Sequence, residues 1–138
     1  QKYDWITKEE YFRNNLNRSG ASSLKKGYDK LLGSQIEVDV LKGSHWSKEN
    51  KIKEVDLLWV DVQGSEKEVI LGFEDEIQKV KFLWIEYGEE FYEGAMNRSQ
   101  TIDLLDSLGF DCIEKYSNKV YHPQGDLLFT NKKHSLVV

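Results

Sequence analysis

The chain of 138 residues has the length of one domain, and its 39% apolar and 31% charged residues are typical of a soluble globular protein. The net charge of −5 disfavours general nucleic-acid binding and docking on an anionic membrane, because both need a basic face. There is no membrane-length apolar run and no signal-peptide core, and the single cysteine excludes an intrachain disulfide. A cytoplasmic setting is therefore the default expectation.

The first third of the chain is expected to be the least regular part of a single domain covering residues 1–138. Residues 1–34 are rich in turn-forming asparagine, serine and glycine, which indicates an irregular, loop-rich lead-in. Residues 35–41 alternate apolar and acidic side chains, a pattern that predicts a half-exposed edge strand. The polar segment 42–53 is expected to form a loop.

Two apolar runs that each end in a carboxylate dominate the middle of the chain. Residues 55–62 are apolar almost throughout and end around Asp61, which predicts a strand covered on both faces, as in a parallel sheet. Residues 80–86 repeat this pattern and end at Glu86. Residues 65–71 between them are predicted to be helical, so the segment forms a right-handed βαβ unit.

The last third is predicted to hold one helix and two strands. Ser99 is a suitable N-cap for a helix that ends near Leu108. Residues 110–116 and 126–131 are expected to form an antiparallel pair of strands. The predicted fold class is therefore α/β, with a mixed sheet of about five strands that has an antiparallel C-terminal pair, and with helices on the faces of the sheet.

The acidic strand ends form the main candidate site. Ligands bind outside the carboxyl ends of parallel strands, so Asp61 and Glu86 are expected to face one cleft, with Glu66 close by. Such carboxylates could bind a metal, orient a hydroxyl or amine, or share a proton. Glu66 could equally serve only as a helix cap, and Glu86 could be structural. The histidines His45, His122 and His134 are predicted to lie at the surface, and Cys112 in the core. Four aromatic residues could line a pocket, although loop aromatics more often cover a core edge: Trp46, Tyr87, Phe91 and Tyr92.

Residues 55–72, VDLLWVDVQGSEKEVILG, resemble the core motif of the FkbM-type S-adenosylmethionine-dependent methyltransferases. That family has an apolar strand ending in D-x-E/Q-G-x-E, followed by a helix that closes on a glycine. Supporting likenesses extend over residues 19–131. The motif positions in this sequence are Asp61, Gln63, Gly64 and Glu66.

The resemblance implies a partial Rossmann-like class I methyltransferase sheet and methyl transfer from S-adenosylmethionine to a hydroxyl of a small molecule or sugar. It implies that Asp61 positions the acceptor or the cofactor, supported by Glu86 and Glu66, and that Asp61, Gln63 and Gly64 contact the cofactor. The sequence has no metal-ligand motif, no GxGxxG turn and no GxxxxGK[ST] loop.

The glycine-rich first strand and the acidic second strand end with which the family holds its cofactor are not found in this sequence. We therefore expect a C-terminal portion of the parent domain, truncated and with its activity in question. The missing strands would pair beside residues 57–62, so this strand is expected to have an unpaired edge. The edge predicts either self-association into a homo-oligomer or cover by residues 1–34.

Two other functions stay open. One is a non-catalytic interaction module that self-associates through the exposed sheet edge. The other is a metal-dependent hydrolase that uses Asp61, Glu66 and Glu86, although no histidine lies near them in the sequence.

Overall fold

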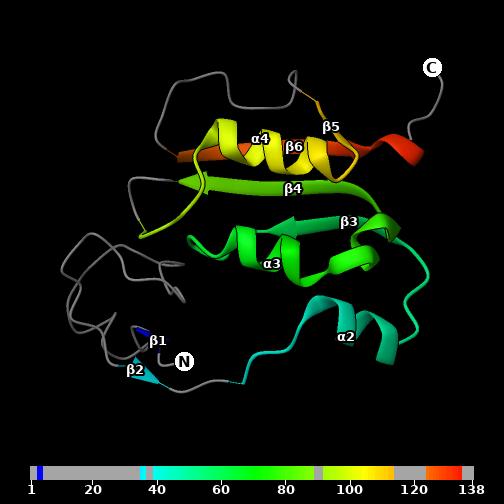
Figure 1. The fold of residues 1–138 in the computed structure, drawn as a ribbon, viewed down its shortest axis with the longest axis horizontal. Helices are drawn as coiled ribbons and strands as arrows, with labels where there is room; N and C mark the ends of the chain where they lie inside the picture. The colour runs from blue at the N-terminus through cyan, green and yellow to red at the C-terminus, as the bar shows by residue number, and fades with distance from the viewer. Residues whose placement is uncertain (1–2, 5–34, 37–38, 89–91, 114–123, 135–138) are drawn as a thin grey trace.

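The structure is a computed structural model, and it describes residues 3–4, 35–36, 39–88, 92–113 and 124–134. Most of the predicted lead-in, residues 1–34, lies outside these ranges. A mixed four-stranded sheet forms the centre (Figure 1), with its strands in the spatial order β3 (Val55–Val60), β4 (Val80–Gly88), β6 (Gln124–Asn131) and β5 (Phe110–Cys112). β3 runs parallel to β4, and β6 is antiparallel to both β4 and β5. The predicted α/β class and mixed sheet are confirmed.

The helices connect these strands. The crossover from β3 to β4 consists of α3 (Glu66–Gly72) and the 3-10 helix η1 (Glu74–Lys79). α4 (Arg98–Ser107) precedes β5, and the short 3-10 helix η3 (Lys132–His134) follows β6. None of the described helices is long and apolar enough to cross a membrane.

The core lies between one face of the sheet and the helices α3 and α4 (Figure 1). Along β4, alternate side chains point into it, and Leu83 and Ile85 are fully buried. Ile70 of α3 and Leu105 of α4 belong to the same apolar cluster. This alternation is the period of two that a strand gives its side chains, so helices that cover one face bury every second residue.

The opposite face of the sheet is apolar and exposed over β3. Leu57 and Trp59 are 50% and 65% exposed, and Phe82, the register partner of Leu57 on β4, is 40% exposed. The rings of Trp59 and Trp84 lie 5.9 Å apart between centroids. The prediction that the apolar run of β3 is covered on both faces, and that helices lie on both, is thus wrong for the described residues. In this part of the chain β3 is also the edge strand of its sheet, paired only with β4.

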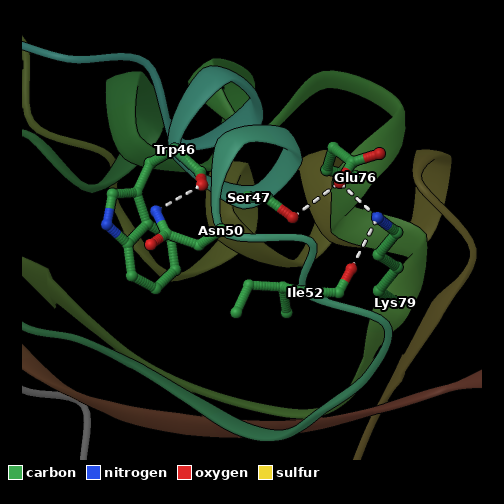
Figure 2. Close-up of polar contacts among 6 residues, drawn as sticks. All are labelled: Trp46, Ser47, Asn50, Ile52, Glu76 and Lys79. Atoms are coloured by element: carbon green, nitrogen blue, oxygen red, sulfur yellow. Dashed lines mark hydrogen bonds and ion pairs between the residues drawn. The ribbon is translucent and has the colours of Figure 1, made fainter.

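The segment 42–53, predicted to be a loop, contains the helix α2 (Gly43–Glu49). Polar contacts attach this segment to η1 (Figure 2). The buried Ser47 hydroxyl donates to Glu76 Oε2 at 2.6 Å. Lys79 pairs with the same carboxylate and donates to the carbonyl of Ile52 at 2.8 Å. The hydrogen bond from Lys79 holds the pKa of Glu76 below its ordinary value.

The predicted edge strand 35–41 is confirmed at β2 (Gln35–Ile36) and wrong at residues 39–41, and residues 37–38 lie outside the described ranges. β2 pairs with β1 (Tyr3–Asp4) in a separate two-stranded ladder. Residues 39–41 have no regular structure. The four-stranded sheet therefore lacks the fifth strand that the alternation predicted, within the described ranges.

The last third follows the prediction more closely. α4 forms, but its cap is Asn97 and not Ser99: Asn97 Oδ1 accepts from the amide of Gln100, and Gln100 Oε1 accepts from the amide of Asn97. This reciprocal capping box satisfies two otherwise free amides at the helix start. The antiparallel pairing of β5 and β6 is confirmed. Residues 114–116 of the predicted strand lie outside the described ranges.

The positions of the histidines and of the cysteine were also predicted from the sequence. His45 and His134 are exposed, as predicted, and His122 lies outside the described residues. Cys112 is partly buried against the apolar core, so its predicted core position is close to what the structure shows.

Candidate functional site

The candidate site begins at the turn that follows β3. β3 and β4 are parallel, so their carboxyl ends meet at one edge of the sheet, where both arrowheads point in Figure 1. Directly after β3 come Asp61, Gln63 and Gly64. Gln63 and Gly64 both adopt positive φ, 54° and 97°. A Cβ atom on Gly64 would lie 2.4 Å from the Cβ of Tyr92, so only glycine fits at this point of the turn.

Glu66 stabilises this turn by hydrogen bonds to its backbone. Its side chain is buried, at 2% exposure, in the first turn of α3. Its Oε1 accepts a hydrogen bond from the amide of Val62 at 3.2 Å and from the amide of Gly64 at 3.0 Å. Both donors precede α3, and its N-cap, Ser65, makes no side-chain cap hydrogen bond, so Glu66 stabilises the turn before the helix and does not act as the helix cap that the sequence left open. Its predicted catalytic role remains a prediction.

Asp61 and Glu86, the two predicted strand-end carboxylates, are brought together by a glutamine. Gln63 Nε2 donates to Asp61 Oδ1 at 2.6 Å and to Glu86 Oε2 at 3.1 Å. The hydroxyl of Tyr92 donates to Gln63 Oε1 at 2.8 Å, and Gln124 Nε2 donates to Glu86 Oε1 at 2.5 Å. We call these five side chains the carboxylate network.

One member of the carboxylate network, Gln124, was missed from the sequence. Gln124 belongs to β6, which lies beside β4 although it is 38 positions away from Glu86 in sequence. Nothing in the local pattern around Gln124 indicates that neighbour. Tyr92 was given as an aromatic that could line a pocket, with cover of a core edge as the favoured interpretation, and its hydroxyl contacts Gln63 in the candidate site. An amide side chain at the end of a predicted strand is the sequence feature that could have pointed to Gln124.

Electrostatics distinguish Glu86 from an ordinary surface carboxylate. Burial raises the pKa of Glu86 to about 7, and the negative charges of Asp61 and Glu66 act in the same direction. The hydrogen bond from Gln124 opposes this rise by stabilising the carboxylate. Glu86 therefore exchanges a proton near neutral pH, which is the property of a general base or acid at that pH.

The chemistry open to this arrangement is hydrogen bonding and proton transfer. A hydroxyl placed at the carboxylate network can donate to Asp61 or Glu86, and the partly ionised Glu86 can take its proton. Among the described residues, no group of three or more His, Cys, Asp or Glu side chains could hold a metal ion. The geometry thus gives no support to the metal-dependent hydrolase alternative.

Comparison with known proteins identifies the family. The sequence matches the family described as methyltransferase FkbM domain over residues 2–112. The 2-O-methyltransferase NoeI of Sinorhizobium fredii (strain NBRC 101917 / NGR234) is 34% identical over 99 residues, which make up 71% of this chain and 39% of that relative. The chain thus matches less than half of the length of this relative. No solved structure matches the chain. The match spans both acidic strand ends of the candidate site, and the chain belongs to the FkbM family of methyltransferase domains.

Proposed function

We propose that this chain carries the acceptor-binding side of a methyltransferase that methylates a hydroxyl group of a small molecule or sugar. The observation that carries the proposal is the joining of Asp61 and Glu86 by Gln63 at the carboxyl ends of two parallel strands. That edge is where α/β sheets bind their ligands. The similar NoeI protein is named a 2-O-methyltransferase, which supports a hydroxyl as the acceptor.

The sheet is, in this proposal, the C-terminal part of a Rossmann-like class I methyltransferase sheet. The parallel pair of β3 and β4, joined by α3 and η1, supports this assignment, as does the antiparallel last strand. The exposed apolar face of β3 agrees with a chain that represents one portion of a larger domain. The family match favours this function over a non-catalytic interaction module.

Asp61 and Glu86 have different roles in the proposed reaction. Asp61 is exposed at the edge of the sheet and orients the acceptor hydroxyl as a hydrogen-bond acceptor. Glu86, whose pKa is raised to about 7, would accept the proton that the acceptor hydroxyl loses when it is methylated. Positioned proton transfer of this kind typically contributes about 10²- to 10⁴-fold to a rate.

S-adenosylmethionine is the cofactor that the family implies, and when bound it supplies a methyl group on a cationic sulfur. The chemistry of the carboxylate network fits such a group, because two carboxylates at one edge favour a nearby positive charge. We propose that Gln63 and Gly64 lie toward the cofactor and that Asp61 lies between the cofactor and the acceptor hydroxyl, where it can contact both. The sequence contains no GxGxxG turn, so no residue is assigned to the nucleoside.

A methyl-transfer assay tests the proposal. The natural polypeptide that contains this chain is incubated with radiolabelled S-adenosylmethionine and a panel of sugars with free hydroxyl groups, and labelled product is counted. Asp61→Ala, which removes the acceptor oxygens, should lower transfer by about 10²-fold through loss of orientation. The matched control is Asp56→Ala near the opposite end of β3, where Asp56 is exposed and pairs at the surface with Lys81 among the described residues, so transfer should change little. Transfer that survives in Asp61→Ala as well as in Asp56→Ala would contradict the proposed role of Asp61.

A further inference from the structure

Gln63 occupies the centre of the carboxylate network and uses both ends of its amide. The two hydrogens of Nε2 point to different carboxylates, one on Asp61 and one on Glu86. Oε1 accepts from the hydroxyl of Tyr92. A rotation that exchanged the oxygen and the nitrogen would place the amide oxygen against two carboxylates, so these partners allow one orientation of the amide.

The backbone around Gln63 is held as firmly as its side chain. Gln63 has a φ of 54°, in the left-handed region that few residues other than glycine adopt. The residues on either side of it, Val62 and Gly64, both donate their amides to the buried Glu66 carboxylate. Tyr92 packs against Gly64 at a distance that leaves no room for a Cβ atom there. The turn thus presents the Gln63 side chain in one place, at the cost of an uncommon backbone conformation.

We propose that Gln63 is a positioning residue: its amide holds the side chains of Asp61 and Glu86 in a fixed arrangement, and Tyr92 fixes the orientation of that amide. The inference rests on the proposed function for its effect on methyl transfer. The positioning itself is a property of the chain without cofactor or acceptor, so it can be measured separately.

The charges around Glu86 explain why a neutral donor is needed between the two carboxylates. The titratable groups of the described residues near Glu86 are Asp61 after β3, Glu66 on α3 and Asp126, its register partner on β6, with the Tyr92 hydroxyl reached through Gln63. The negative charges of Asp61 and Glu66 disfavour the ionised form of Glu86. The amide of Gln63 donates to that form and stabilises it.

Two substitutions of Gln63 test its amide donor and its side-chain length separately. Gln63→Glu keeps the size of the side chain but replaces the amide donor with a further carboxylate. It should raise the pKa of Glu86 by about one unit or more. Gln63→Asn shortens the side chain by one methylene and suits a left-handed backbone, so the turn is kept while the reach to Glu86 is lost. It should also raise the pKa of Glu86, but by less than Gln63→Glu does.

The experiment follows the Glu86 carboxyl carbon by NMR in the 138-residue chain as pH is varied. Tyr92→Phe should raise the titration midpoint of Glu86 by a few tenths of a unit, because the freed amide donates less well to the carboxylate. This effect should vanish in the Gln63→Asn background, since Tyr92 acts through Gln63. The matched control is Tyr87→Phe, which removes a buried hydroxyl that has no hydrogen-bond partner in the described part of the chain. It should leave the midpoint unchanged.

The possible results distinguish failure of the positioning role of Gln63 from failure of the proposed function. An unchanged Glu86 midpoint in both Gln63 variants would overturn the inference, as would an equal effect of Tyr92→Phe in the presence and absence of Gln63. Amide spectra report whether each variant is folded, and Gln63→Asn keeps the test available if Gln63→Glu unfolds. Shifts in the midpoint without any methyl transfer would refute the proposed function and leave the positioning role intact. Methyl transfer without such shifts would refute the positioning role alone.

Discussion

Replacing Glu66 with alanine removes the common acceptor of two backbone hydrogen bonds in the turn after β3. The amides of Gly64, which is buried, and Val62, which is half-buried, would both lose their partner. Each backbone donor left unsatisfied away from water costs about 1–3 kcal/mol. The alanine variant should therefore lose about 2–5 kcal/mol, a large part of the roughly 5–15 kcal/mol by which native proteins are stable.

Urea unfolding followed by circular dichroism measures this loss. With a slope of about 2 kcal/mol per molar urea, the midpoint should fall by about 1–2 M. Glu66→Gln is the matched control, because its amide oxygen can still accept both hydrogen bonds, and it should lose only about 1 kcal/mol. An alanine variant within about 0.5 kcal/mol of the wild type would refute the assignment of Glu66 as the anchor of this turn.

Three further predictions test other parts of the structure. Asn131 is fully buried and donates to the carbonyls of Val80 and Gln78, so Asn131→Ala should cost about 2–4 kcal/mol in a urea titration, and a cost near zero would contradict these contacts. The pKa of Glu86 is raised to about 7, so the folded state binds this proton more tightly than the unfolded state does. The stability that protonated Glu86 contributes is therefore complete below about pH 4.5, and it is lost as the pH rises through about 7. Glu86→Gln should flatten the dependence of unfolding free energy on pH in this window, and an unchanged slope would count against the shifted pKa. The predicted self-association through the edge strand β3 should weaken in Trp59→Lys, because Trp59 is 65% exposed and a lysine on an edge strand disfavours pairing with another chain. A Trp59→Lys variant that sediments as the same oligomer as the wild type would contradict this interface.

The sequence predicted the elements whose apolar pattern is strong. The runs that became β3 and β4 are long, apolar and separated by one helical segment, which is enough to predict a parallel pair. α2 was missed because it has only seven residues and depends on a distant partner: Ser47 bonds to Glu76, 29 positions further along the chain. Local pattern carries no information about such a contact.

The exposed face of β3 shows a second limit. A continuous apolar run predicts cover on both faces, and Leu57 and Trp59 are as apolar as that pattern requires. Burial also depends on what packs against the strand, which the run itself does not encode. Among the described residues, the helices of the core cover only the face that carries Val60.

The sequence also predicted only part of the candidate site. Asp61 and Glu86 could be placed together because parallel strands bring their carboxyl ends to one edge. Gln124 could not, because its position depends on β6 lying between β4 and β5. The bridging amide of Gln63 depends on its positive φ, and a motif shows the residue type at that position but not its conformation.

The pH dependence of methyl transfer tests the central claim most directly. The rate for the natural polypeptide that contains this chain should rise with pH to a plateau with a midpoint near 7, as Glu86 becomes the carboxylate that takes the hydroxyl proton. Glu86→Gln should lower the plateau by about 10²- to 10⁴-fold and remove this limb of the profile. A wild-type rate that is flat from about pH 5.5 to 8.5, or a Glu86→Gln variant that keeps the wild-type profile, would contradict the account.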